Sequence, residues 1–193
     1  MTPADLAGSP PTTTIGTDRL VLRRFTPDDG AGLHAILSRP EAVAFEPYDV
    51  QARARCDELA AARAHDPSFW AVCLRDEGTL VGIVYLHHDD PREWRGHSLG
   101  YVFHPDHWHQ GYATEACRAL LDVCFLLWGA HRVSAHCDPR NEASWRLLER
   151  LGLRREGRFV EAASFTTDAL GNPVWHDVHQ YAVLDHEWGT VGT

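Results

Sequence analysis

The sequence contains no lysine, and all 18 of its basic residues are arginine. This absence excludes a catalytic lysine and acetylation of the chain on its own lysine side chains. The 18 arginines are outnumbered by 27 acidic residues, which gives a formal net charge of -9. An acidic chain argues against a nucleic-acid partner, since nucleic-acid binders present basic surfaces. The same charge favours a cationic partner, such as an amine.

Cysteine is sparse and follows no disulfide pattern. The five cysteines are an odd number, and no Cys-x-x-Cys pair occurs among them, which argues against a disulfide framework. No apolar stretch approaches the length of a membrane-spanning helix, and the N-terminus lacks the charged-then-apolar pattern of a signal segment. We therefore expect a cytoplasmic protein with no membrane partner.

The length of 193 residues fits one domain. Residues 1–16 are rich in Pro, Thr, Ser, Gly and Ala, and we expect them to form a flexible N-terminal tail. The single domain then spans residues 17–189. The sequence leaves open whether this domain is a monomer or a homodimer.

Hydrophobic periodicity and turn residues predict alternating strands and helices. Thr26 followed by Pro27 indicates a helix start, and Gly152 indicates the left-handed end of the last helix. The pattern predicts an α/β fold, with a mixed sheet of about seven strands flanked by about four helices. The predicted strands are 18–25, 69–74, 80–86, 97–103, 131–137, 153–163 and 174–184. The helices are predicted to begin near 27, 50, 114 and 141, and 40–50 is expected to be a loop.

The stretch from Leu99 to Ala116 has the pattern of a strand, a short loop and a helix, so the next strand should run parallel to the first. Gly111 and the small Ala113 stand where the helix begins. The first N–H groups of a helix lack intrahelical partners and lie at the positive end of its dipole. Because small residues let an anion approach that backbone closely, the segment predicts a phosphate site.

This loop resembles the acetyl-CoA pyrophosphate loop of the GNAT superfamily of N-acetyltransferases. Its Gly-Tyr-Ala-Thr-Glu-Ala run, ending at Ala116, is similar to the RimJ/RimL-like branch. Trp108 departs from the Gln or Arg that opens the superfamily pattern. The resemblance implies that the pyrophosphate of CoA is held by main-chain N–H groups, those of His109, Gln110, Gly111, Tyr112, Ala113 and Thr114.

Further segments resemble the same branch, in the same order along the chain. They cover about residues 18–188 and imply the GNAT fold. The matching segments are Thr17-Asp18-Arg19-Leu20 through Phe25, Asn141-x-x-Ser144 through Gly152 with Arg155-Glu156-Gly157, and Trp175-x-Asp177 with Tyr181-Ala182.

The resemblance implies an enzyme that moves the acetyl group of acetyl-CoA to a primary amine by direct attack in a ternary complex, without a metal. An N–H donor must meet the negative charge that develops on the thioester carbonyl. Ser144 matches the family residue that faces the CoA sulfur, and Asn141 matches one near the pantetheine. Helix capping is the alternative role for both. The carbonyl donor is implied to come from the main chain of the strand, at Tyr101, Val102 and Phe103.

The attacking ammonium must lose a proton, and the sequence leaves the base open. Many relatives carry a Glu at the strand position that is Ser98 here. His97 is one candidate, because imidazole titrates at about 6.5, although strand alternation turns it away from Ser98. Glu46 is a second candidate, and a water chain without a single base is a third. Tyr48 is expected to line the acceptor pocket.

Two other functions fit parts of the sequence. The missing glutamate is consistent with a non-catalytic sensor that binds acyl-CoA. The histidine-rich segments 87–90 and 104–109 are similar to metal-ligand clusters and suggest a metal-dependent hydrolase. Against the hydrolase, neither segment has a matched second cluster at a known spacing.

The acceptor is the least determined part of this interpretation, because a fold does not specify a substrate. RimJ/RimL-like proteins are implied to act on protein N-termini, while other relatives act on small cationic amines, and we retain both classes. We expect the amine to enter between residues 45–48 and the last hairpin, near Phe165, Trp175 and Asp177. The alternative is that Trp175 and Asp177 only lock the hairpin.

Overall fold

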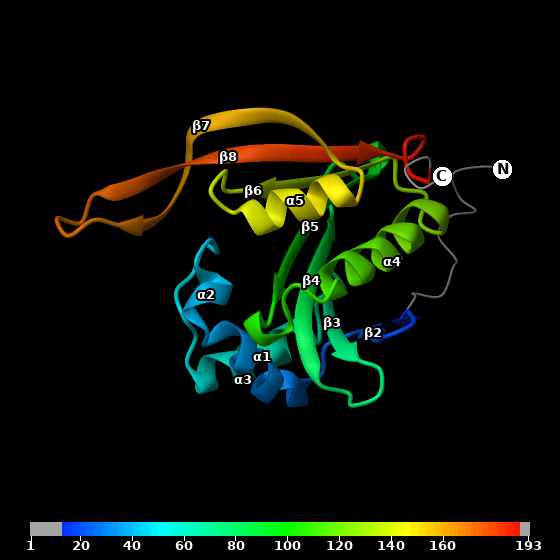
Figure 1. The fold of residues 1–193 in the computed structure, drawn as a ribbon, viewed down its shortest axis with the longest axis horizontal. Coiled ribbons are helices and arrows are strands. Elements are labelled where there is room, and N and C mark those ends of the chain that lie inside the picture. The colour runs from blue at the N-terminus through cyan, green and yellow to red at the C-terminus, as the bar shows by residue number, and fades with distance from the viewer. Residues whose placement is uncertain (1–12, 190–193) are drawn as a thin grey trace.

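The computed structural model describes residues 13–189, which form one eight-stranded mixed sheet with helices on both faces (Figure 1). The strand order is β1-β2-β3-β4-β5-β6-β8-β7. The strands are β1 (Thr14–Gly16), β2 (Leu20–Arg23), β3 (Phe69–Leu74), β4 (Leu80–His88), β5 (Gly96–Phe103), β6 (Arg132–Cys137), β7 (Arg154–Thr167) and β8 (Pro173–Leu184).

Within residues 13–189, the connections contain five α-helices and three short 3-10 turns. No helix within residues 13–189 has both the length and the apolar character needed to cross a bilayer. The helices are α1 (Gly30–Leu37), α2 (Pro40–Val43), α3 (Arg53–Arg63), α4 (Tyr112–Leu126) and α5 (Glu142–Arg150), and the turns are η2 (Pro27–Asp29), η3 (Arg92–Trp94) and η4 (Pro105–His107).

The predicted α/β fold is confirmed, with one strand and one helix more than expected. Residues 14–16 had been expected in the tail, but they form β1 and pair with β2; residues 1–12 of that expected tail lie outside the described part of the chain. Residues 40–43 had been expected in a loop and form α2. Both elements are only three or four residues long, too short to show a hydrophobic period.

Alternating strand residues fill two hydrophobic cores, one on each face of the sheet. In β3, Trp70 and Val72 belong to the core beneath α4 and α5, whereas Ala71 and Cys73 belong to the core beneath α1 and α3. The polar helix α3 buries only one residue besides Cys56, as its composition predicts. The apolar stripe of α4 is buried and consists of Ala116, Cys117, Leu120, Leu121, Cys124 and Phe125.

β5 and β6 form the one parallel pair among the described strands, and they separate partway along. Their pairing starts at Gly96 and ends at Leu99 and Ala135. β5 then continues beside β4 to Phe103, while β6 continues beside β8 to Cys137. The sheet therefore opens into a fork after Leu99, with main-chain groups on its inner edges that lack a ladder partner.

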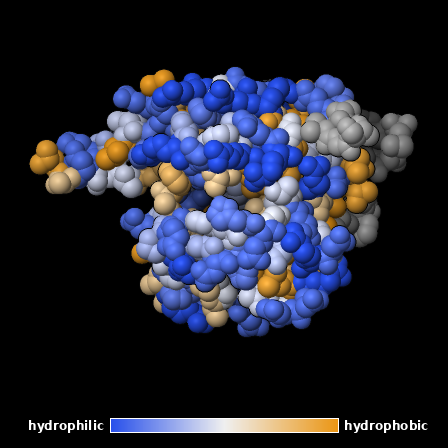
Figure 2. All heavy atoms as spheres, viewed as in Figure 1, coloured by the Kyte–Doolittle hydropathy of each residue, from blue (hydrophilic) through white to orange (hydrophobic). Residues whose placement is uncertain are grey.

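The β7–β8 hairpin projects well beyond the rest of the domain (Figure 1). Its tip carries exposed hydrophobic residues (Figure 2), among them Leu170, which is 86% exposed. β7 continues four residues past its predicted end at residue 163. The prediction stopped early because these distal residues are polar or exposed and show no alternation between a buried and an exposed face.

Arg23 and Asp29 hold the chain where it enters α1. The Arg23 guanidinium donates to both Asp29 oxygens at 2.8 and 2.6 Å, and the Thr26 N–H donates to Oδ2 at 2.7 Å. Thr26 is the N-cap residue of this turn, as the Thr-Pro pair predicts. Burial would raise the pKa of Asp29, but the hydrogen bonds from Arg23 and Thr26 outweigh it and hold that pKa below its usual value.

We expect Asp29→Asn to lower the free energy of unfolding by about 2 kcal/mol at pH 7, because it breaks a largely buried, two-pronged ion pair. A carboxylate with a depressed folded pKa stabilises the fold above its unfolded pKa of about 3.9, and this contribution is lost as pH falls through the folded pKa. The deficit should therefore shrink at pH 3. Urea unfolding measures both effects, with the exposed Asp28→Asn as control. Equal losses in the two variants, or a deficit unchanged at pH 3, would contradict this role.

Candidate active site

The loop between β5 and α4 has the conformation that a close anion contact needs. Gly111 is the N-cap of α4 and has a φ of 83°, and His109 has a φ of 60°. A glycine adopts this left-handed conformation without steric cost. A Cβ atom at Gly111 would lie 3.4 Å from Arg19 Nη2, so the open side of the loop is bordered by a guanidinium.

Six consecutive N–H groups of this loop, those of residues 109–114, donate to no acceptor within the described chain. The first backbone hydrogen bond after them runs from Glu115 N to Gly111 O, at 3.0 Å. These donors are at the positive end of the α4 dipole. The geometry fits a pyrophosphate, as the sequence predicts for His109, Gln110, Gly111, Tyr112, Ala113 and Thr114.

Arg19 and Glu115 hold the loop against β2. Arg19 Nη1 donates to Gln110 O at 2.9 Å, and Arg19 Nη2 pairs with Glu115 Oε2 at 2.6 Å. Thr17 Oγ1 donates to Glu115 Oε1 at 2.6 Å. Burial would raise the pKa of Glu115, but the hydrogen bonds from Thr17 and Arg19 hold it below its usual value. The sequence interpretation missed this anchor, although Thr17 and Arg19 both belong to the first matching segment.

Trp108, the residue that departs from the superfamily pattern, has a structural role. Its indole Nε1 donates to Phe103 O at 2.9 Å. The bond satisfies a main-chain carbonyl where β5 ends. This contact fixes the start of the loop relative to the strand.

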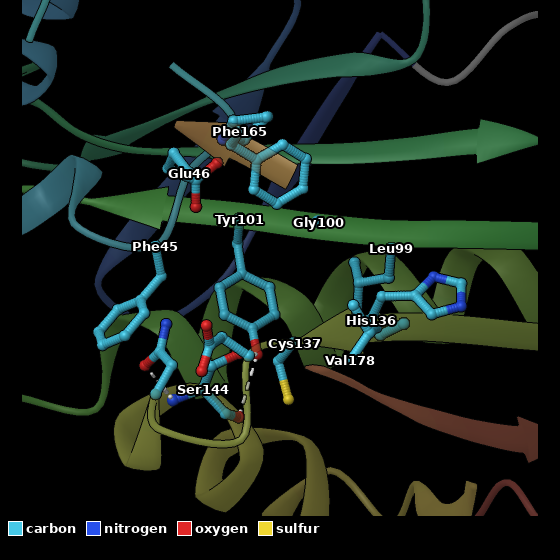
Figure 3. A pocket seen from close by; sticks show the side chains of 14 residues that line it. Phe45, Glu46, Leu99, Gly100, Tyr101, His136, Cys137, Ser144, Phe165 and Val178 are labelled. Carbon is cyan, nitrogen blue, oxygen red and sulfur yellow. Dashed lines mark hydrogen bonds between the residues drawn. The ribbon is translucent and has the colours of Figure 1, made fainter. Parts of the chain in front are cut away.

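A cavity of about 230 Å³ lies at the fork between β5 and β6 (Figure 3). Its walls come from the segment after α2, from both strands of the fork, from the start of α5 and from the hairpin. The lining residues are Phe45, Glu46, Pro47, Leu99, Gly100, Tyr101, Ala135, His136, Cys137, Asp138, Asn141, Ser144, Phe165 and Val178.

Ser144 and Tyr101 form a hydroxyl pair in this cavity (Figure 3). The Tyr101 hydroxyl is 3.0 Å from Ser144 Oγ and 3.1 Å from Ser144 O. Burial raises the pKa of Tyr101, so its hydroxyl stays protonated. The sequence interpretation gave Tyr101 a main-chain role only and missed the side chain, because no local pattern relates residue 101 to residue 144.

Asn141 has the capping role that the sequence allowed. Its Oδ1 accepts from the Ser144 N–H at 3.1 Å, which caps α5. Ser144 takes part in this cap through its main chain, and its side-chain hydroxyl remains in the cavity beside Tyr101. Asn141 lines the same cavity.

The two candidate bases lie in different places. Glu46 lines the cavity (Figure 3). Burial raises the pKa of Glu46 to about 7, although a hydrogen bond from Tyr48 and the charge of Arg63 act to lower it. His97 is 6% exposed and its ring stacks on that of His88 at 4.5 Å. Burial, together with the neighbouring His88, lowers the pKa of His97 to about 4. His97 is not among the described residues that line the cavity.

The strand residues proposed from the sequence divide between the cavity and the core. Tyr101 lines the cavity together with Gly100, where β5 has lost its β6 partner. The side chains of Val102 and Phe103 are buried in the two hydrophobic cores and do not line the cavity within the described chain. The main-chain donor that the resemblance implies in this strand stays a prediction, because the positions of these side chains do not test it.

The hairpin contributes one wall of the site. Phe165 lines the cavity, whereas Trp175 and Asp177 are not among its described lining residues. Tyr48 lines a second cavity of about 570 Å³, which shares Glu46 and Phe165 with the first. Within residues 13–189, no three His, Cys, Asp or Glu side chains are arranged to hold a metal ion.

Comparison with known sequences identifies this architecture. The family model of the acetyltransferase (GNAT) domain matches residues 19–154, more than half of the chain. The chain is 32% identical over 179 residues to the uncharacterized N-acetyltransferase YnaD of Bacillus subtilis, a match that covers 90% of this chain and 98% of YnaD.

Solved structures agree with the sequence match. An acetyltransferase (GNAT family) from Bacillus anthracis has a TM-score of 0.81 and 30% identity, covering 91% of this chain and 100% of that chain. A putative ribosomal-protein-serine acetyltransferase from Vibrio cholerae has a TM-score of 0.73 and 25% identity, covering 91% and 99%. The second match agrees with the RimJ/RimL-like character of the loop. The chain therefore belongs to the GNAT family of acetyl-CoA-dependent N-acetyltransferases.

Proposed function

We propose that this chain transfers the acetyl group of acetyl-CoA to a primary amine by direct attack in a ternary complex. The observation that carries the proposal is a single cavity containing a carboxyl group that titrates near neutral pH, Glu46, and a hydroxyl pair, Ser144 and Tyr101. The free N–H groups of residues 109–114 hold the pyrophosphate. Acetyl-CoA, when bound, supplies the acetyl group as a thioester.

Glu46 is the general base of the proposed reaction. A group that takes a proton from an ammonium works best when its pKa lies near the working pH, and burial brings the pKa of Glu46 to about 7. Tyr48 and Arg63 favour the ionised carboxylate and limit this rise. His97 is not among the described residues that line the cavity, which supports Glu46 over His97 as the base.

Ser144 is the donor to the leaving sulfur. The Tyr101 proton has two acceptors within reach, Ser144 O and Ser144 Oγ. When Tyr101 donates to Ser144 Oγ, the serine proton is available to an acceptor in the cavity, where its present neighbour is Cys137. The Ser144 hydroxyl, oriented by the buried Tyr101, can then stabilise the negative charge that develops on the leaving sulfur.

The cavity also contains a thiol, Cys137, which does not compete as a nucleophile. Burial raises the pKa of Cys137 to about 11. The thiolate is the nucleophilic form of cysteine, and very little of it exists at neutral pH with such a pKa. This supports direct transfer to the amine over an acetylated enzyme.

The acceptor enters between α2 and the hairpin, where the surface is hollowed in the space-filling view (Figure 2). The second cavity lies on this route and adjoins the first through Glu46 and Phe165. Asp49 borders the outer cavity and Asp138 the inner one. Carboxylates along the route favour a cationic acceptor, and we propose a protein N-terminus or a small cationic amine.

An acceptor panel tests this function. Wild type should acetylate cationic peptides or spermidine, with kcat/KM rising as pH increases through about 7, because Glu46 must be ionised to accept a proton. Glu46→Gln should lower kcat/KM by about a hundredfold to ten-thousandfold and remove this rise. The release of free CoA thiol from acetyl-CoA measures the rate. Glu41→Gln is the matched control, since Glu41 is an exposed carboxylate on the neighbouring helix α2.

Two results would overturn parts of this proposal. Acetyl-CoA binding without turnover of any amine would make the chain an acyl-CoA-binding sensor. A wild-type pH profile in Glu46→Gln would transfer the proton-accepting role from Glu46 to a water chain.

We expect Gly111→Glu to weaken CoA binding by at least about tenfold, or 1.4 kcal/mol. The new carboxylate would stand among the six free N–H groups and repel the pyrophosphate. Isothermal titration calorimetry with CoA measures the change. Gly171→Glu is the control, because Gly171 has the same φ of 83° and a Cβ there meets nothing within 4 Å. Equal affinities in the two variants would contradict the placement of the site.

We expect Ser144→Ala to lower kcat by about tenfold to a thousandfold, by analogy with the loss of one donor to a developing anion. Because this hydrogen bond strengthens as the sulfur becomes negative, CoA affinity should stay the same. Tyr101→Phe should act in the same direction. Alanine retains the N–H that Asn141 caps, so urea unfolding should show little loss of stability. An unchanged kcat would leave Ser144 with a capping role alone.

A further inference from the structure

The β7–β8 hairpin contains a large bulge between its base and the part that covers the cavity. Phe159 pairs with Val178 and Ala163 pairs with His176. Between these two pairs β7 contains residues 160–162, while β8 contains only Asp177. A bulge bends the longer strand and increases its twist. The part of β7 after the bulge therefore runs in a different direction from the part before it.

The Asp177 carboxylate holds this bulge. Its Oδ1 accepts from the Glu161 N–H at 2.9 Å, and its Oδ2 accepts from Arg158 Nε at 2.8 Å. Glu161 has a φ of 50°, a conformation that a residue other than glycine adopts at a cost. The Asp177 side chain on β8 thus accepts a main-chain N–H of the bulge. It also binds Arg158, which belongs to the part of β7 that precedes the bulge.

The neighbours of Asp177 face the substrate side of the hairpin. Side chains alternate along a strand, and Val178 lines the inner cavity. His176 lies 2.9 Å from Arg140 Nη2 through its Nδ1, and its ring stacks with Phe165 at 6.3 Å between centroids. Phe165 lines both cavities. The carboxylate and the acceptor wall therefore lie on opposite faces of one strand pair.

We propose that Asp177 is a positioning residue for the acceptor, an inference that rests on the proposed function. By holding the bulge at residues 160–162, it sets the register in which Ala163 pairs with His176, whose ring stacks with Phe165 beside a second irregularity between Ser164 and Thr166. Since a slip of one residue turns every strand side chain to the other face, losing this register would take Phe165 from the acceptor wall. Asp177 itself lines neither cavity within the described chain.

The remaining polar contacts of the wall tie it to the start of α5. The Arg140 guanidinium donates to both oxygens of Asp138, at 2.9 and 2.5 Å, and Asp138 lines the inner cavity. The hairpin is thus held from the outside by Asp177 and from the inside through His176. The outer contact can be removed without changing a residue that lines either cavity within the described chain.

The test compares Asp177→Ala with Asp168→Ala. Asp168 is a matched control because it also accepts main-chain N–H groups of the hairpin, those of Leu170 and Asn172, at 2.8 and 2.9 Å. It lies at the tip and lines neither cavity within the described residues. We expect Asp177→Ala to raise the acceptor KM about tenfold, the effect of losing one charge-assisted hydrogen bond, while kcat and CoA affinity stay within about twofold. Asp168→Ala should leave all three constants unchanged.

A second variant and a second measurement separate positioning from general stability. In Asp177→Asn the amide Oδ1 still accepts from the Glu161 N–H, so the acceptor KM should rise less than in Asp177→Ala. Hydrogen exchange followed by mass spectrometry should show faster exchange at residues 159–167 in Asp177→Ala. In Asp168→Ala the faster exchange should be confined to residues 168–172.

The outcomes are distinguishable. A wild-type chain that acetylates no amine overturns the proposed function and this inference with it. An active wild type with an unchanged acceptor KM in Asp177→Ala overturns the inference alone, as does an equal rise in Asp168→Ala or a loss of CoA affinity in Asp177→Ala. A selective rise in the acceptor KM, together with faster exchange at the bulge, supports it.

Discussion

The separation of two parallel strands is the constraint on which the site depends. β5 and β6 are paired only as far as Leu99 and Ala135, and each then follows a different antiparallel neighbour. Main-chain groups that a continuous sheet would have consumed face the fork instead. The same separation makes room for the cavity, which the start of α5 borders. The cavity and the Tyr101–Ser144 pair therefore share one structural origin.

Arginine–carboxylate pairs hold the segments around this fork. Arg19 ties the binding loop to β2 through Glu115, Arg23 fixes the entry into α1, and Arg158 joins Asp177 at the hairpin bulge. Each guanidinium donates through more than one nitrogen of its planar group, whereas a lysine side chain has only one ammonium nitrogen. In a chain without lysine, charge thus positions the main chain around the site, while the groups proposed to react are a carboxyl group and a hydroxyl pair.

The proposed cofactor side could be predicted from the sequence, because its determinants are local. The left-handed Gly111, the unpaired N–H groups at the start of α4 and the Asn141 cap all involve residues within one turn of each other. The acceptor side could not be predicted in the same way. The choice between Glu46 and His97 depends on burial, and the role of the Tyr101 side chain depends on a partner 43 residues away.

The sequence by itself determined the order of all strands and helices except the short β1 and α2, the apolar periodicity of the main elements and the strand–loop–helix pattern at Gly111. These features follow from backbone preferences and side-chain periodicity over a few residues. The tertiary structure decided which carboxylate titrates near neutral pH, which hydroxyl faces the cavity and how the hairpin bends over it. These properties arise from desolvation and from contacts between elements that are distant in the chain, and no local pattern encodes either.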